Sequence, residues 1–168
     1  VSRLGMATRW FAAEYGGAVF SSTNGNTWTS LGTGFPTGIG RVALGVQPDN
    51  ANVLYAVIAN TLGALQSVRR LDALAGAWKN VASPPNVLPT SSSGSSQGDY
   101  DLCIAVDPNN ANRLYLGGSY FNADPFPASI WRCDVAAAGA AYTMTGASIG
   151  TQAHADVHCL VHAPGDSN

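Results

Sequence analysis

Charged residues are scarce in this chain: Asp, Glu, Lys and Arg make up 11% of its 168 residues, against about 25% in a typical soluble domain. The net charge is −2, so the sequence gives no electrostatic basis for binding nucleic acid or an anionic membrane surface. No run of about 18 apolar residues occurs, so no membrane span is predicted. No signal peptide is recognisable, and the chain begins at Val1 rather than Met, from which we expect a processed or excised polypeptide.

Two segments of the chain repeat each other. Residues 41–58 read RVALGVQPDNANVLYAVI, and residues 101–118 read DLCIAVDPNNANRLYLGG. Each is a short apolar run, a Pro and Asn turn cluster and a second apolar run, which is typical of two antiparallel strands joined by a tight loop. The first copy is followed by two more β-forming runs, Leu65–Leu71 and Ala77–Val81, which are predicted as its third and fourth strands. Such a repeat predicts an array of equivalent supersecondary units.

A third copy of the repeat begins near the end, where Cys159 and Pro164 have the same spacing as Cys103 and Pro108. Cys103 and Cys159 hold the same repeat position, so one interpretation is a disulfide between them. The odd number of cysteines, with Cys133 as the third, then leaves a free thiol or a bond to another chain. The other interpretation is that the cysteines are small buried hydrophobic residues. No Cys-x-x-Cys occurs, which argues against a zinc knuckle or a thioredoxin-type site.

Short β-forming runs separated by Gly, Pro and Asn extend along the chain without any sustained 3.6-residue period, which excludes a helical solenoid. Four strands per unit fit the blades of a β-propeller. We therefore expect an all-β fold, a segment of a β-propeller built of four-stranded antiparallel blades in an incomplete ring. Its expected parts are a blade end at 1–34, blades at 41–85 and 99–150, and the start of the next blade at 154–168.

One octapeptide, SSTNGNTW, resembles the Asp-box of the BNR and sortilin-like β-propellers. Ser21, Gly25, Thr27 and Trp28 fit the pattern Ser-x-Asp-x-Gly-x-Thr-Trp, and Thr23 stands at the Asp position. Asn-Gly within the octapeptide is itself a strong hairpin signal. In that family the box is a hairpin between the third and fourth strands of a blade and usually lies away from the catalytic face, so the resemblance implies a structural role.

The order of the longer motifs, QGxYDL, DPNN, LYxGG, IWR and HADxH, resembles secreted bacterial proteins that carry sortilin-like BNR propellers, over nearly the whole chain. The resemblance implies a secreted or cell-surface binding or structural module for glycan or protein partners. An alternative is a glycoside hydrolase, xyloglucanase-like or sialidase-like, with its active site on the propeller face. We expect the remainder of the propeller, or a second chain, to complete the ring and to supply the strand beside His158–Val161.

Asp101 and Asp156 are the candidates for a catalytic pair, one from each of two adjacent blades. Glycoside hydrolases need two carboxylates about 5–10 Å apart across a cleft. The xyloglucanase-type hydrolases share this blade type and use aspartates at inner strands. The alternative is that such aspartates only cap turns.

His154, Asp156 and His158 alternate, so on a strand they would point to one face and could ligate a divalent metal such as zinc. The outer two would be roughly 13 Å apart on a straight strand, so a shared ion requires the strand to bend. The alternative is a hydrogen-bonded polar cluster. No other cofactor is indicated.

Aromatic residues in or beside loops are good platforms for sugars or protein partners, and they can also simply pack within loops. The ligand-binding candidates of this kind are Tyr100, Tyr120 and Phe121. Residues that recur at equivalent places on the predicted strands should instead be buried. These are Trp28, Val46, Leu54, Ile104, Val106, Leu114 and Trp131.

Overall fold

The computed structural model describes residues 2–4, 7–48, 50–90, 96–120 and 125–163. These residues form twelve β-strands and no helix, so the prediction of an all-β chain is confirmed. None of the described residues belongs to a helix that could cross a membrane. Short β-branched and aromatic runs between Gly, Pro and Asn turns account for this strand-rich fold.

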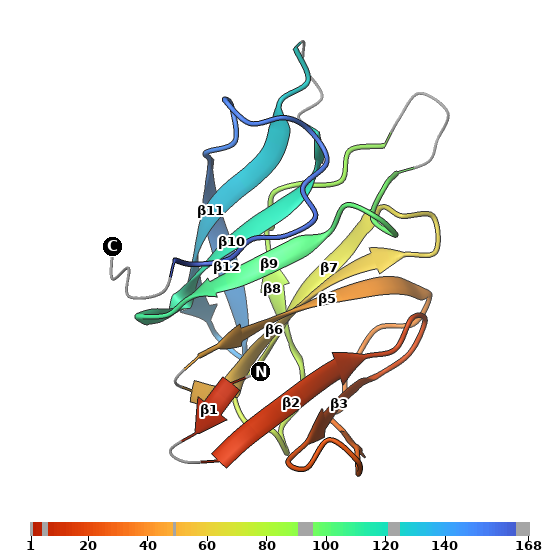
Figure 1. Ribbon diagram of the computed structural model, residues 1–168, viewed down its shortest axis with the longest axis vertical. Helices are drawn as coiled ribbons and strands as arrows, with labels where there is room; N and C mark the ends of the chain where they lie inside the picture. The colour runs from red at the N-terminus through yellow and green to blue at the C-terminus, as the bar shows by residue number, and fades with distance from the viewer. Residues whose placement is uncertain (1, 5–6, 49, 91–95, 121–124, 164–168) are drawn as a thin grey trace.

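The strands form two sheets, and Figure 1 shows the smaller one at the lower end. The four-stranded sheet contains β1 (Ser2–Leu4), β2 (Ala7–Ala13), β3 (Val19–Ser22) and β4 (Thr29–Ser30), in that order. The eight-stranded sheet has the order β5-β6-β7-β8-β12-β11-β10-β9. Its strands are β5 (Ile39–Gln47), β6 (Asn50–Asn60), β7 (Leu65–Leu71), β8 (Lys79–Ala82), β9 (Cys103–Asp107), β10 (Asn110–Tyr120), β11 (Ala128–Ala138) and β12 (Ala141–Ser148).

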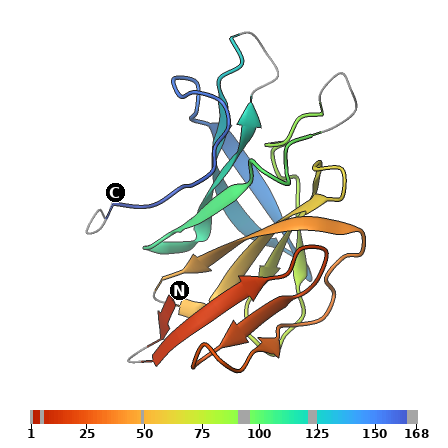
Figure 2. The same ribbon diagram turned by 45° about the vertical axis from the view of Figure 1, so that its right-hand side comes forward.

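The eight-stranded sheet consists of two antiparallel four-stranded meanders joined by a short parallel contact between β8 and β12. That contact spans only two residue pairs, Val81 with Tyr142 and Ala82 with Thr143. At the opposite edges, β5 and β9 lie side by side without strand pairing. A side chain at Gly45 of β5 would place its Cβ 2.9 Å from Ile104 of β9. The sheet therefore nearly closes on itself (Figure 2), whereas the sequence predicted separate four-stranded blades.

The two copies of the sequence repeat adopt the same strand register. Residue pairs across β5 and β6 recur, at the equivalent repeat positions, across β9 and β10. The matching pairs include Val46–Leu54 with Val106–Leu114, Gly45–Tyr55 with Ala105–Tyr115, and Leu44–Ala56 with Ile104–Leu116. The repeat in the sequence is thus also a structural repeat.

Strand β6 is buried on both faces, and its alternate residues belong to two different hydrophobic cores. No side chain in residues 53–59 exposes more than 6% of its surface. Leu54 and Ile58 lie in the core between β6 and the four-stranded sheet. Tyr55 and Val57 lie in the core inside the eight-stranded sheet. A strand that is buried on both faces needs apolar side chains at successive positions, and the sequence has such a continuous apolar run here.

Equivalent residues of the two meanders face in the same direction along the molecule. Leu54 faces the four-stranded sheet that precedes its meander, and Leu114 faces the meander that precedes its own. Tyr55 contacts the following meander through its hydroxyl, which donates to the carbonyl of Ala111 at 2.9 Å. Tyr115 contacts the segment that follows it, with its ring 5.2 Å from that of His162. Each meander therefore uses equivalent residues to contact the part of the chain before it and the part after it.

Burial follows the sequence prediction in part. Four of the predicted core residues are buried: Leu54, Ile104, Val106 and Leu114. Val46 and Trp131 are half-buried. The prediction for Trp28 is wrong, because its side chain is 41% exposed and its indole N–H donates to the carbonyl of Gly25 in its own turn, at 3.2 Å.

The hairpin between β3 and β4 has the hydrogen bonding of a tight side-chain-capped turn. Asn24 Oδ1 accepts the backbone N–H groups two and three residues further on, each at 2.9 Å. Ser22 Oγ accepts the N–H of Gly25 at 2.9 Å, and Gly25 has a φ of +76°. The turn's acceptor is therefore Asn24 rather than Thr23, which stands at the Asp position of the box pattern. Asn is well suited to this because its side chain readily bonds nearby backbone groups.

A buried arginine joins the two meanders at the end of β7. The side chain of Arg70 lies between the rings of Tyr55 and Tyr142, 5.3 and 4.5 Å from their centroids. It donates to Asp72 Oδ1 at 2.7 Å, to the hydroxyl of Tyr55 at 2.7 Å and to Asn112 Oδ1 at 2.6 Å. Arg70 therefore ties its own meander to β10 and β12 of the other one.

Replacing Arg70 with Met should lower the free energy of unfolding by about 2–4 kcal/mol, because it leaves the partly buried Asp72 without its guanidinium. Urea unfolding followed by tryptophan fluorescence measures the change. Arg132→Met is the matched control, because the Arg132 side chain is 49% exposed and only 3.9 Å from its nearest carboxylate. A loss at Arg70 no larger than at Arg132 would contradict the role assigned to the cluster.

Candidate functional site

The most unusual polar group in the described part of the chain is Asp101, which lies just before β9. Its side chain has no solvent exposure. Neither carboxyl oxygen makes a hydrogen bond of normal geometry with the described residues. The nearest groups are the carboxyl of Asp156 and the imidazole of His158, whose Nδ1 lies 3.4 Å from Oδ1. A buried carboxyl without strong partners is costly in its ionised form.

The pKa of Asp101 is raised to about 6, first because burial disfavours the carboxylate and second because the carboxyl of Asp156 lies against it. His158 and Arg41 act in the opposite direction and do not cancel these effects. Asp101 therefore keeps its proton well above the range of an ordinary aspartate. The carboxyl of Asp156 is placed to accept that proton in a hydrogen bond from Asp101.

The residues after β12 bring Asp156 and His158 to Asp101. Figure 1 shows this segment crossing in front of β9 and β10. The N–H of Asp156 donates to the carbonyl of Ser119 and that of Val157 to the carbonyl of Gly118, each at 2.9 Å. The sequence prediction of a strand at His158–Val161 is wrong, since these residues form none. β9 pairs with β10 only as far as Gly117, so the segment bonds to the last residues of β10 beyond that point. The φ of +70° at Asp156 interrupts an extended course.

Gly117 is what allows the segment to pack this closely. A Cβ at Gly117 would lie 2.6 Å from Cys103 Sγ and 2.7 Å from Val157 Cγ1. Gly118 is still more restricted, because its Cβ would lie 1.9 Å from the carbonyl oxygen of Val87. Gly117 therefore lets the segment that completes the site pack against β10, and Gly118 lets the loop at Val87 approach the same strand.

The three residues predicted to bind a metal do not converge. Asp156 and His158 lie against Asp101, whereas His154 is exposed and its Nδ1 lies 2.9 Å from the carbonyl oxygen of Ala155. Among the described residues no three His, Cys, Asp or Glu side chains are grouped so as to hold an ion. The alternation expected on a strand is absent because the segment is not a strand.

Of the aromatic candidates, Tyr100 belongs to the site. Its side chain is 60% exposed, and its ring lies edge-on to that of His158 with centroids 4.5 Å apart. Tyr120 is half-buried and packs against Phe126, with centroids 5.8 Å apart. Phe121 lies outside the described residues.

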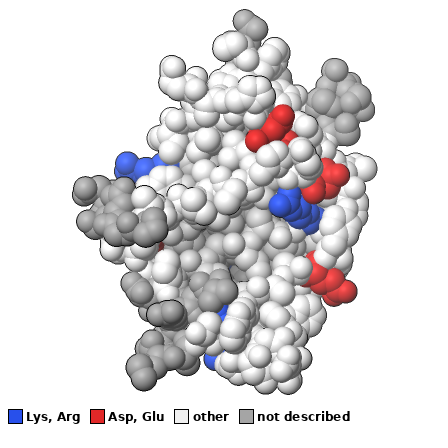
Figure 3. Space-filling view, in the orientation of Figure 1, with Lys and Arg blue, Asp and Glu red and all other residues white. Residues whose placement is uncertain are grey.

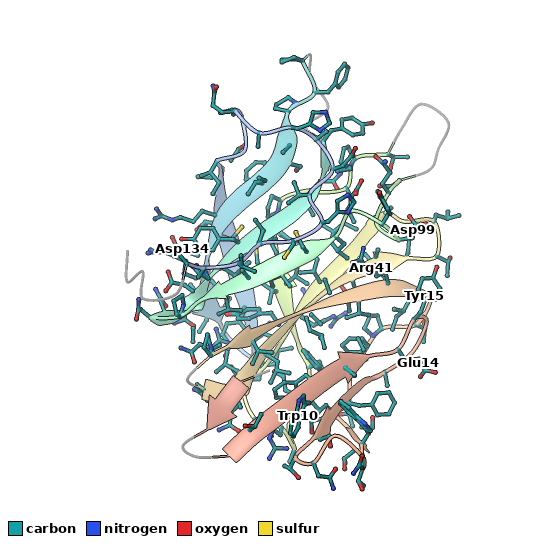
Figure 4. The ribbon with its side chains drawn as sticks, in the orientation of Figure 1. Trp10, Glu14, Tyr15, Arg41, Asp99 and Asp134 are labelled. Atoms are coloured by element: carbon teal, nitrogen blue, oxygen red, sulfur yellow. The ribbon has the colours of Figure 1, made fainter. Side chains whose placement is uncertain are left out.

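Sequence reasoning did not single out Arg41, which approaches the site from β5. Its guanidinium donates to the backbone carbonyl of Tyr100. In Figure 4 Arg41 lies beneath the loop that carries Asp99. Figure 3 shows the same region as a basic group between acidic ones on an otherwise mostly uncharged face. The signal was present in the repeat, because Arg41 and Asp101 occupy equivalent positions with opposite charges.

All three cysteines are free thiols, with Cys103 and Cys133 buried and Cys159 exposed. Burial raises the pKa of Cys103 to about 11 and that of Cys133 to about 12. The Sγ of Cys103 lies 3.4 Å from the carbonyl oxygen of Val157. The disulfide between Cys103 and Cys159 is thus not formed in this structure, and two of the cysteines are small buried side chains.

Comparisons of the chain with protein-family profiles, with curated proteins and with solved structures find no match. Any statement about function must therefore come from the residues and their arrangement. The part of the chain that brings together the most unusual chemistry is the cluster of Asp101, Asp156, His158 and Tyr100.

The free energy of unfolding should fall as the pH rises from about 4 to about 6. Asp101 holds its proton more tightly in the folded state, where its pKa is about 6, than when unfolded, where the ordinary value is 3.8. This stabilising contribution is complete below the unfolded pKa and lost above the folded one. It amounts to at most about 3 kcal/mol. Asp101→Asn should flatten this part of the profile in urea titrations, and the exposed neighbour Asp99→Asn should not. An unchanged slope in Asp101→Asn would refute the assignment.

The native protein should show one rapidly reacting thiol, Cys159, in a titration with an aromatic disulfide reagent, and three after denaturation. Only the thiolate reacts, and Cys103 and Cys133 are both buried and strongly disfavoured as thiolates. Cys159→Ser should abolish the fast reaction. A second fast thiol in the native Cys159→Ser protein would contradict the burial of the other two.

Proposed function

We propose that this chain is part of a β-propeller of the Asp-box type that acts as a secreted or cell-surface binding module. Three observations support the propeller. The four-stranded units pack face to face, and equivalent residues make the contacts each time. The β5–β6 and β9–β10 hairpins have the same register. The hairpin between β3 and β4 carries the octapeptide that resembles the Asp-box. Stacked four-stranded antiparallel sheets are how propeller blades bury their apolar faces.

The parallel contact of β8 with β12 is compatible with such blades because it covers only two residue pairs at the outer strands. The segment 153–163 lies on the face of β10 that corresponds to the face of β6 covered by the second meander. This is where a following blade would begin. The remainder of the propeller, or a second chain, is therefore the proposed structural partner.

We infer that the module binds a glycan at the end of the strands where Tyr100 and His158 meet. The single observation that carries this is the exposed ring of Tyr100, edge-on to His158 above the proton-holding carboxyl of Asp101. An aromatic ring stacks on the C–H face of a sugar, while an imidazole and a carboxyl exchange hydrogen bonds with its hydroxyl groups. A protein partner would use the same ring as an anchor, and it is the alternative ligand.

A glycoside hydrolase is the second candidate, favoured by one observation. Asp101 keeps its proton to about pH 6, as a general acid must, beside the second carboxyl of Asp156. Hydrolysis needs the two carboxyls about 5–10 Å apart with the sugar between them. Here they lie against each other and Asp101 is fully buried, so the arrangement supports binding better than cleavage.

Tyr100→Ala should weaken glycan binding by about five- to thirtyfold, because stacking on an aromatic ring contributes on the order of 1–2 kcal/mol. A glycan array identifies the ligand, and titration calorimetry measures the affinity of the variant. Tyr15→Ala is the matched control, since Tyr15 is 66% exposed and lies just after β2, outside the site. Equal binding by Tyr100→Ala and the native protein would overturn the proposal.

The hydrolase alternative is tested separately with plant and bacterial polysaccharides, by assaying for released reducing sugar. Activity lost in both Asp101→Asn and Asp156→Asn would establish the hydrolase. Activity retained in both variants would exclude these carboxyls as its catalytic pair. Binding on the array without release of sugar supports the binding module.

A further inference from the structure

A cavity lies at the other end of the strands from Asp101, beside the hairpin between β3 and β4. Its volume is about 750 Å³, within the range of about 300–1,000 Å³ typical of small-ligand sites. Its walls are β3, the turn that follows, residues 29–33 and the loop at 74–76. The site around Asp101 shares no residue with it.

The lining of this cavity is rich in short hydroxyl side chains and contains no acidic residue. The hydroxyls of Thr27, Thr29, Ser30 and Thr33 can each donate and accept a hydrogen bond. All four residues are exposed. Small apolar surface is supplied by Leu31 and Leu74. Such a mixture matches a polyhydroxylated ring, which has apolar faces and hydroxyl groups around its edge.

One cation, Arg9 of β2, lines the cavity. Arg9 is half-buried, and its side chain forms no ion pair or hydrogen bond with the described residues. By contrast, Arg70 and Arg113 each have a carboxylate partner within 2.8 Å. A guanidinium presents paired N–H donors that match a carboxylate or a sulfate, so Arg9 is suited to bind the anionic group of a ligand.

We propose that this cavity binds an acidic sugar residue, with its carboxylate or sulfate on Arg9 and its hydroxyl groups on the Thr and Ser side chains. The proposal concerns a site separate from that of Tyr100 and Asp101 and does not rest on the function proposed for them. A uronic acid and a sulfated sugar share the chemistry that Arg9 recognises. The two sources are distinguished by the experiment.

The test is chemical-shift titration of the isotope-labelled chain with glucuronate, glucose 6-sulfate, glucose and sodium sulfate. We expect the backbone signals of residues 22–33 and 74–76 to shift with one or both acidic sugars, and the stronger of the two identifies the anionic group. Glucose should bind at least tenfold more weakly, because it lacks the charge-assisted contact. Shifts with sulfate alone as large as with the acidic sugars would overturn the sugar assignment, leaving a simple anion site. No shift with any of the four probes would overturn the site.

Arg9→Gln should weaken binding of the acidic sugar at least tenfold without altering the Tyr100-dependent glycan binding. Arg132→Gln, on β11 of the other sheet, is the matched control and should bind as the native chain does. Ala75→Trp provides a second route, because a large side chain on the exposed loop at 74–76 fills the cavity without changing Arg9. Full binding in either Arg9→Gln or Ala75→Trp would refute the proposal.

Discussion

The double-sided burial of β6 is the constraint on which the rest of the structure depends. Its alternate side chains supply one wall of each hydrophobic core. Each large apolar side chain buried in this way contributes about 1.5–3 kcal/mol. Because a one-residue slip would exchange the residues of the two cores, the register of β6 with β5 and β7 is fixed from both sides. The small sheet and the second meander take their positions from that single strand.

Three charged residues of the chain lie where its units meet. Arg70 joins the first meander to the second at one end, and Arg41 reaches the loop before β9 at the other. Asp101 lies beneath the segment that follows β12. In a chain with only 11% charged residues, these three groups each occupy a junction between parts that are distant in sequence. Burial there changes proton affinity, which is why the most perturbed carboxyl is also found at a junction.

Much of the fold could be predicted from the sequence because its information is local and repeated. The strand Leu65–Leu71 was predicted with the bounds that the structure shows, and the sequence repeat predicted two matching hairpins. The meeting of Asp101 with Asp156 followed from placing them in successive units. The pattern carries no information on side-chain networks across units, so the cluster around Arg70 was missed. It also cannot specify that Asp156 adopts a left-handed backbone, which removed the expected strand and the metal geometry.

The line along which β5 meets β9 is held differently from every other strand boundary in the eight-stranded sheet. Side chains pack across it at Gly45, and two side chains, of Arg41 and Gln47, reach backbone carbonyls on the far side. No hydrogen-bonded ladder joins the two described strands. Ladder hydrogen bonds resist shear collectively, whereas packed side chains mainly resist compression. Under a pulling force we therefore expect the two meanders to separate first between β5 and β9, while the hydrogen-bonded ladders of β6 with β5 and β7 stay intact.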